Sequence, residues 1–204
     1  MDLDLKQKAP ISLVFLALAL PAAGLAQEPD YTPITAGQRW NDYVSSSVLS
    51  PSVAFSSLAS AAISHVSKDP VQWGQGSRGY LERVGDHWAR FGVDGTIHSG
   101  LAAALGHDTR YFREPDQSGW HRTRHALRRT LFTRNREGHT VFDVSQMAGM
   151  FGTPMAASLW NPRNRRHSVL EEGVRAGTFG IGMQAGTNMF KEFGPDLKRA
   201  IFGK

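Results

Sequence analysis

Residues 168–195 read SVLEEGVRAGTFGIGMQAGTNMFKEFGP. Ser168 and Glu171 have the S-x-x-E spacing of a capping box, in which two side chains bind free backbone N–H groups at the start of a helix. Gly194-Pro195 is the usual order at a helix end, because glycine adopts the left-handed conformation and proline cannot continue the helix. We therefore predict one long helix that begins at Ser168 and stops before Gly194.

Glycines recur along this helix at a four-residue spacing, Gly173-x-x-x-Gly177 and Gly182-x-x-x-Gly186. Each interior glycine costs about 1 kcal/mol relative to alanine, so their presence needs a reason. One interpretation is close packing in a membrane or an oligomer, where this spacing is common. The other is close packing inside a soluble bundle. We favour the second, because the helix carries charged residues and lacks a span of about 20 apolar residues.

Apolar residues at helical spacing extend over most of the chain, and no segment shows sustained alternation of apolar and polar residues. Asp143-x-x-Gln146 resembles a second capping box. We therefore predict an all-α fold, a single compact domain of about six helices. The predicted helices cover 35–49, 53–66, 80–105, 120–132, 144–159 and 168–193, with a short one at 196–202.

The N-terminus has the pattern of a secretory signal peptide. Lys6 and Lys8 precede the apolar run ISLVFLALAL at 11–20, and small residues surround Ala26. The run is about half the length that spans a bilayer. We predict a signal peptide at 1–26, an extended leader at 27–34 and a helical domain at 35–204, in the periplasm or cell envelope of a bacterium. An uncleaved N-terminal anchor is the alternative.

Composition excludes several classes of protein. The chain has 204 residues, a formal net charge of +5 and no cysteine. The absence of cysteine excludes disulfides, thiol catalysis and thiolate metal sites. The chain therefore depends on packing for its stability.

Arginines are concentrated between residues 110 and 136. This segment contains eight arginines, no lysine and two acidic residues. A basic amphipathic helix is typical of a membrane surface or an acidic partner. We predict an anionic surface-binding face formed by Arg122, Arg124, Arg128 and Arg129. Its partner would be anionic lipid headgroups or an envelope protein, and not nucleic acid, because the chain is exported. The alternative is a solvated face that acids from other helices neutralise.

Catalytic and metal-binding signals are weak. His107 and Asp108 lie in a predicted loop and are the candidates for acid–base chemistry. His121 and His125 have the i, i+4 spacing that brings two imidazoles to one metal, but no glutamate follows His121 to complete the HExxH pattern. We predict no metal site and no cofactor.

Three short motifs carry a family resemblance: Tyr111-Phe112-Arg113, Thr133-Arg134 with Gly138, and Lys191-Glu192-Phe193 with Pro195-Asp196. With them the chain resembles a family of uncharacterised exported bacterial proteins. The resemblance implies export and a helical domain, but it implies no activity and no catalytic residue.

Our leading hypothesis from the sequence is a non-enzymatic envelope protein that binds a membrane surface or a partner. Two alternatives stay open. One is a periplasmic hydrolase that uses His107, Asp108 or the histidine pair. The other is a homo-oligomeric membrane assembly that forms through the glycine-spaced helix.

Overall fold

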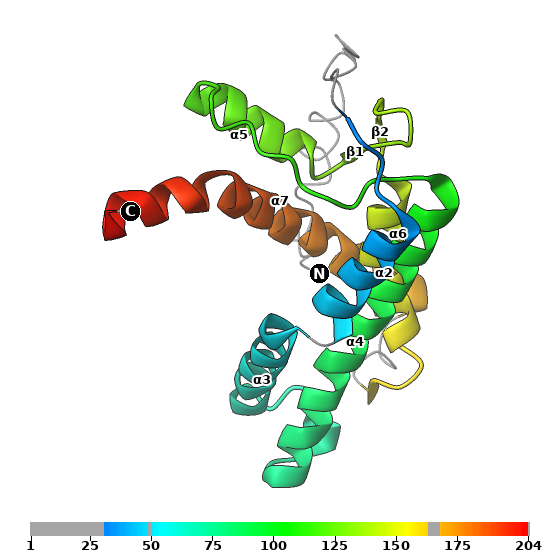
Figure 1. Cartoon of the computed structure of the whole chain (residues 1–204). Helices are drawn as coiled ribbons and strands as arrows, with labels where there is room; N and C mark the ends of the chain where they lie inside the picture. The colour runs from blue at the N-terminus through cyan, green and yellow to red at the C-terminus, as the bar shows by residue number, and fades with distance from the viewer. Residues whose placement is uncertain (1–30, 49, 163–167, 204) are drawn as a thin grey trace, which may run out of the picture.

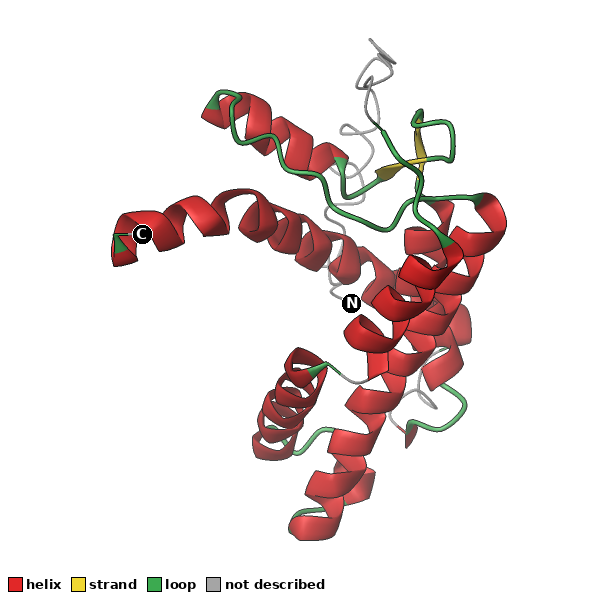
Figure 2. Ribbon diagram, in the orientation of Figure 1, coloured by secondary structure: helices red, strands yellow, loops and turns green. Residues whose placement is uncertain are grey.

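The computed structural model describes residues 31–48, 50–162 and 168–203, which are helical apart from one small hairpin (Figures 1 and 2). The predicted all-α class is confirmed. The predicted signal peptide lies outside the described residues. The elements are α2 (Ala36–Tyr43), a π-helix η2 (Val44–Val48), α3 (Pro51–Val66), a 3-10 helix η3 (Val71–Trp73), α4 (Ser77–Leu105), α5 (Gly119–Arg128), β1 (Phe132–Arg134), β2 (Thr140–Phe142), α6 (Val144–Ala157) and α7 (Val169–Phe202).

Helix α7 begins where the sequence predicts, but it does not end there. The Ser168 hydroxyl accepts a hydrogen bond of 3.1 Å from the backbone N–H of Glu171. The helix then continues through Pro195 to Phe202, so the predicted break and the separate C-terminal helix are wrong. A proline inside a helix removes a backbone hydrogen bond and normally kinks or stops it. Side chains from outside α7 bind its backbone beside Pro195, as described below.

Helix α4 is the centre of the arrangement (Figure 1). It packs against α3 on one side and α6 on another, and α6 packs in turn against α7. Helix α5 contacts α7 near the C-terminal half of that helix. The long α4 and α7 therefore hold the shorter elements in place.

The four predicted packing glycines divide into two pairs. A Cβ atom at Gly173 would overlap the Met155 side chain of α6, and one at Gly177 would overlap the ring of Phe151. Packing within the domain therefore accounts for these two glycines. At Gly182 and Gly186 an added Cβ would meet no described atom within 4 Å. The second pair consequently faces away from the described core.

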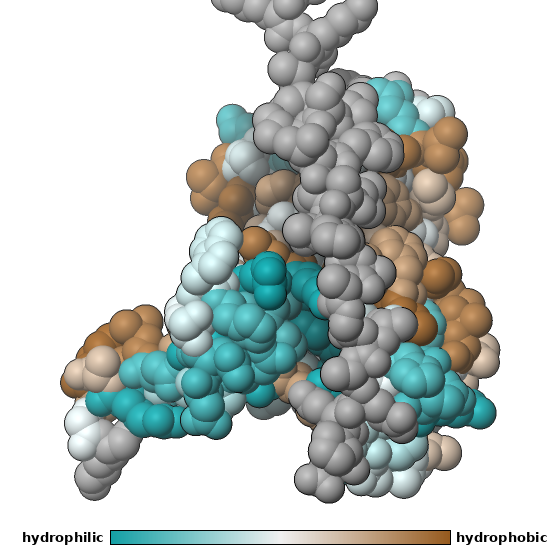
Figure 3. All heavy atoms as spheres, turned by 90° about the horizontal axis from the view of Figure 1, so that it is seen from above, coloured by the Kyte–Doolittle hydropathy of each residue, from teal (hydrophilic) through white to brown (hydrophobic). Residues whose placement is uncertain are grey.

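The interior is polar and the exterior carries the large apolar side chains. The largest fully buried side chains of the described residues are Arg83, Glu192, Asn188, Thr133, Asp108, Ser57 and Ser145. In α4, Arg83 and Asp86 are buried, whereas Trp88 and Phe91 of the opposite, apolar face are exposed. Figure 3 shows the surface from above, where hydrophobic residues lie on both sides of the molecule beside hydrophilic ones. Exposed apolar side chains are common on protein surfaces, but large charged side chains that are fully buried, such as Arg83 and Glu192, are uncommon.

A short antiparallel hairpin follows α5, and the sequence did not predict it. Strands β1 and β2 pair Thr133 with Val141, and Gly138 takes a positive φ of 80° in the turn. Helix α5 accordingly ends at Arg128 instead of 132. Three-residue strands are too short to show an alternating pattern. The hairpin has a structural use, because the Thr133 hydroxyl donates a hydrogen bond of 2.5 Å to the carbonyl of Asp108.

Candidate functional site

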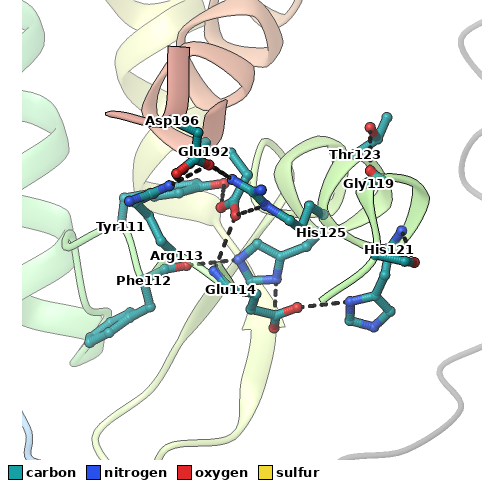
Figure 4. Close-up of polar contacts among 12 residues, drawn as sticks. Tyr111, Phe112, Arg113, Glu114, Gly119, His121, Thr123, His125, Glu192 and Asp196 are labelled. Carbon is teal, nitrogen blue, oxygen red and sulfur yellow. Dashed lines mark hydrogen bonds and ion pairs between the residues drawn. The ribbon is translucent and has the colours of Figure 1, made fainter. Parts of the chain in front are cut away.

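A fully buried carboxylate in α7 organises one end of the molecule (Figure 4). The carboxylate of Glu192 accepts hydrogen bonds from the Tyr111 hydroxyl at 2.9 Å and from Arg122 Nε at 3.0 Å. The backbone N–H of Glu114 adds a third at 3.2 Å. Burial acts to raise the pKa of Glu192, but these donors outweigh burial and the pKa lies below its ordinary value. Glu192 is therefore a charged anchor for the segment 111–114 and for α5.

The backbone around Pro195 is held by the same arginines. Nη2 of Arg113 and Nη2 of Arg122 donate to the carbonyl oxygen of Glu192, at 2.8 and 2.6 Å. Both guanidinium groups also reach Asp196, whose pKa is lowered mainly by its hydrogen bond with Arg122. The structure thus provides external donors to a carbonyl in the helical turn that precedes Pro195.

The predicted arginine face is not a continuous exposed surface. Arg122 is buried against Glu192 and Asp196, and Arg129 Nη2 donates to the carbonyl of Arg110 at 2.8 Å. The expectation that Arg122 and Arg129 are available to an anionic surface is therefore wrong. Arg124 is exposed, and Arg128 is partly exposed over the ring of Phe132. Within the described residues, acids from α7 neutralise Arg122 alone among the arginines of this helix, so the alternative interpretation holds for that residue.

The histidine pair lies on either side of one carboxylate (Figure 4). Nδ1 of His121 and Nδ1 of His125 each lie 3.0 Å from a carboxylate oxygen of Glu114. Nε2 of His125 is 2.9 Å from the carbonyl oxygen of Phe112. Within the described ranges, no group of three His, Cys, Asp or Glu side chains is arranged to hold a metal ion. The pair instead links α5 to the segment 112–114.

Asp108 is held by several donors. Its carboxylate accepts from the Tyr31 hydroxyl at 2.9 Å and from Arg110 Nη2 at 2.6 Å. Burial acts to raise the pKa of Asp108, but the hydrogen bonds keep it below its ordinary value. Burial, together with the bond to Asp108, raises the pKa of Tyr31 to about 12. These contacts give Asp108 a structural role, because it ties the segment before α2 to the loop after α4.

His107 joins a buried Ser–His–Asp group with the wrong geometry for nucleophilic catalysis. Nδ1 of His107 lies 3.1 Å from the hydroxyl of Ser145 and 3.4 Å from the carboxylate of Asp143. Ser145 itself bonds to Asp143 at 2.5 Å. In a catalytic triad the two imidazole nitrogens face different partners, whereas here one nitrogen faces both. Asp143 also accepts from the backbone N–H of Gln146, so the group caps the start of α6.

No family model, no curated protein and no solved structure matches this chain. The functional proposal below therefore rests on the positions and contacts of the residues in the structure.

The sequence motifs described above converge in space. Tyr111 and Arg113 of the first motif bind Glu192 and Asp196 of the third. From the second motif, Arg134 stacks over the ring of Phe112 at 4.6 Å. The Lys191 ammonium lies 5.9 Å from the centre of the Tyr111 ring. The sequence resemblance rests on residues of these motifs, but it did not predict that they form one cluster.

A polar cavity of about 390 Å³ lies beside this cluster. Its walls come from α2, η2, α4, α6, α7 and the loop after α4. The walls include, among others, Arg39, Asp42, Asp94, His98, Arg110, Arg129, Asp143, Gln146, Gln184, Asn188 and Lys191. The sequence contained one signal, since Gln184, Asn188 and Lys191 have the i, i+4, i+7 spacing of one helix face.

Proposed function

We propose that this chain is a non-enzymatic, membrane-associated helical protein of the cell envelope. We further propose that it contacts the membrane through its large apolar exterior and not through the arginines of α5. One observation carries the proposal: charged and polar side chains fill the described interior, while large apolar side chains lie outside.

The apolar exterior is extensive on α7. Phe179, Met183 and Phe190 have exposed fractions of 72%, 59% and 72%. Between Arg175 and Lys191 the helix carries no charged residue. Soluble monomers rarely leave large contiguous apolar patches in water, and such patches mark membrane or protein contacts. Because exposed apolar residues occur on several elements and not on one face, lipid explains them better than a single protein partner does.

Exposed hydroxyl groups on the helices are also satisfied internally. The hydroxyls of Ser67, Thr178 and Thr187 donate to the carbonyls four residues earlier, at 2.8, 2.7 and 3.0 Å. Such bonds remove the cost of placing a hydroxyl in an apolar environment, which has no water to pair with it. These positions are therefore compatible with contact to lipid.

The segment Ala36–Val66 has the length and composition of a membrane span, although Ser50 caps a new helix at Pro51, so that the segment comprises α2, η2 and α3 and not one continuous helix. Its most apolar window has a mean hydropathy of 1.3 and is 25% buried. A stretch of this kind near the N-terminus is compatible with an anchor. It supports membrane association without defining how deeply the domain inserts.

Vesicle flotation tests this proposal. The purified chain is mixed with neutral phosphatidylcholine vesicles or with vesicles that also contain phosphatidylglycerol, at low and at high salt. Because apolar contact needs no lipid charge, we expect flotation with both vesicles and little loss in high salt. If the chain floats only with the anionic vesicles and high salt abolishes this binding, the arginines of α5 and not the apolar exterior make the membrane contact.

Assembly through α7 is the second candidate, and the open pair of glycines favours it. Gly182 and Gly186 have free space above them, and the exposed Phe179, Met183 and Phe190 lie on the same stretch of helix. Small residues at this spacing let two membrane helices approach closely. Light scattering in a mild detergent tests it, since a strictly monomeric particle would exclude assembly of this kind.

A further inference from the structure

We propose that the polar cavity between α4, α6 and α7 binds the phosphate group of a small ligand, through Arg129, Lys191 and His98. This inference is independent of the proposed membrane contact, which concerns the outer surface of the molecule.

Three unpartnered nitrogens belong to residues of this cavity. Nε of Arg129, Nε2 of His98 and Nη1 of Arg39 are buried and have no hydrogen-bond partner within the described structure. A buried donor without a partner is costly and is rarely left in a folded protein. The Arg129 and Arg39 nitrogens are donors in every state, and His98 Nε2 is a donor in the tautomer that carries its proton there, so the cavity suits a ligand with several acceptor atoms.

Lys191 adds a positive charge to the same wall, and the described residues give it no carboxylate partner within ion-pair distance. Burial first, and then the nearby charge of Arg129, lowers the pKa of Lys191. Burial also lowers the pKa of Arg129. The lowered pKa values mean that the charged forms of Lys191 and Arg129 are disfavoured. An anion between them would stabilise the charged form of each.

The acids of the cavity do not meet this need. Asp108 is bound by Arg110 and Tyr31, and Asp143 by Ser145 and the backbone of Gln146. Asp94 accepts from Thr153, and burial raises its pKa, which disfavours its charge. Asp42 also lines the cavity. Arg110 is likewise taken by Asp108. Three of the four acids thus have donors within the chain, whereas Arg129 Nε has no hydrogen-bond partner and Lys191 has no carboxylate within ion-pair distance among the described residues.

The number of donors favours phosphate over a carboxylate. A phosphate offers more acceptor oxygens than a carboxylate, and Arg and Lys are the usual side chains that bind it. The volume lies in the range of small-molecule sites and exceeds what a phosphate alone would fill. Gln146 and Gln184 also line the cavity and could bind polar atoms of the remaining ligand, whereas the Asn188 amide is engaged by Ala126, Thr130 and Gln184. The phosphate belongs to a soluble metabolite or to a lipid headgroup.

Thermal shift in phosphate-free buffer, at constant ionic strength, tests the site. Inorganic phosphate is compared with chloride, for the wild-type chain and for Lys191→Met. We expect phosphate to raise the melting temperature of the wild type more than chloride does. In the variant, we expect at least about a tenfold loss of apparent affinity, because a charged donor is removed. Without ligand the variant should have nearly the stability of the wild type, since Lys191 is an exposed residue and no carboxylate of the described residues lies within ion-pair distance of it.

Two further arms complete the test. Arg129→Gln serves as a second site variant in case Lys191→Met does not fold, and the exposed Arg124→Gln is the matched control that should keep the phosphate response. Glycerol 3-phosphate represents a soluble metabolite and dihexanoyl-phosphatidylglycerol represents a lipid headgroup. The probe that raises the melting temperature at the lower concentration binds more tightly and identifies the source of the phosphate. No specific effect of any phosphate probe on the wild type, or an equal effect on wild type and site variants, would overturn the proposal.

Discussion

The Tyr111 hydroxyl donates a hydrogen bond of 2.9 Å to the carboxylate of Glu192, across a sequence separation of 81 residues. Arg122 binds the same carboxylate from α5, so a loop, a helix and the centre of α7 meet at one buried charge. An ion pair of this kind is sensitive to the loss of either partner, because the remaining charge is left buried.

Removal of the Glu192 carboxylate should therefore destabilise the fold. We expect Glu192→Ala to lower the free energy of unfolding by about 3–5 kcal/mol, because Arg122 and Tyr111 would lose their shared acceptor. Urea titration in a nonionic detergent measures this. The exposed pair Arg78–Glu82 supplies the control, since Glu82→Gln should change stability by less than about 1 kcal/mol. Similar effects of the two substitutions would show that Glu192 is not an anchor.

Acid should weaken the fold through the same group of carboxylates. The pKa values of Asp108, Glu192 and Asp196 are all lower in the folded chain. A carboxylate of this kind contributes stability above its unfolded pKa, about 3.9 for Asp and 4.3 for Glu, and that contribution is lost as the pH falls through the folded value. We expect the melting temperature to fall steadily below about pH 4. Glu192→Gln should have a shallower slope there, and parallel curves for variant and wild type would contradict this assignment.

The two pairs of glycines in α7 should respond in opposite ways to alanine. Gly177→Ala places a Cβ atom against the Phe151 ring and should destabilise by about 1–3 kcal/mol. Gly186→Ala meets open space and should stabilise the helix by up to about 1 kcal/mol. Thermal unfolding of both variants checks the signs. Destabilisation by Gly186→Ala would indicate that another chain or segment covers this face.

Two arginines of α5 provide another comparison. Arg122→Gln leaves the buried Glu192 without its guanidinium and should lower stability by several kcal/mol, about the cost of breaking a buried pair. Arg124→Gln changes an exposed side chain and should be close to neutral. Circular dichroism during thermal unfolding distinguishes them. Equal and small effects would restore the hypothesis of a free arginine surface.

Local sequence signals predicted much of the secondary structure. The cap at Ser168 and the cap at Asp143 both form, because side chains that bind the first N–H groups of a helix act within three residues. Helix α7 passes through Pro195, and Arg113 and Arg122, which lie far away in the sequence, bind the carbonyl of Glu192 in that turn. Local rules therefore predicted a stop that the folded chain does not have.

The site was harder to predict, because its residues meet only in the folded chain. The usual expectation that apolar faces turn inward also failed for α4, where Arg83 is buried and Trp88 is exposed. That expectation assumes water outside the protein. Periodicity identifies the two faces of a helix, but it does not indicate which solvent each face meets.

Vesicle flotation of an α7 variant tests the central claim of apolar membrane contact most directly. Phe179, Met183 and Phe190 are exposed, so their joint replacement by glutamine should preserve the helix. The account predicts that this variant keeps its circular dichroism spectrum but binds neutral phosphatidylcholine vesicles at least about tenfold more weakly, because three apolar side chains no longer enter lipid. Arg124→Gln with Arg128→Gln, the matched surface control, should bind as the wild type does. Unchanged binding of the α7 variant, together with loss of binding in the arginine variant, would contradict the account.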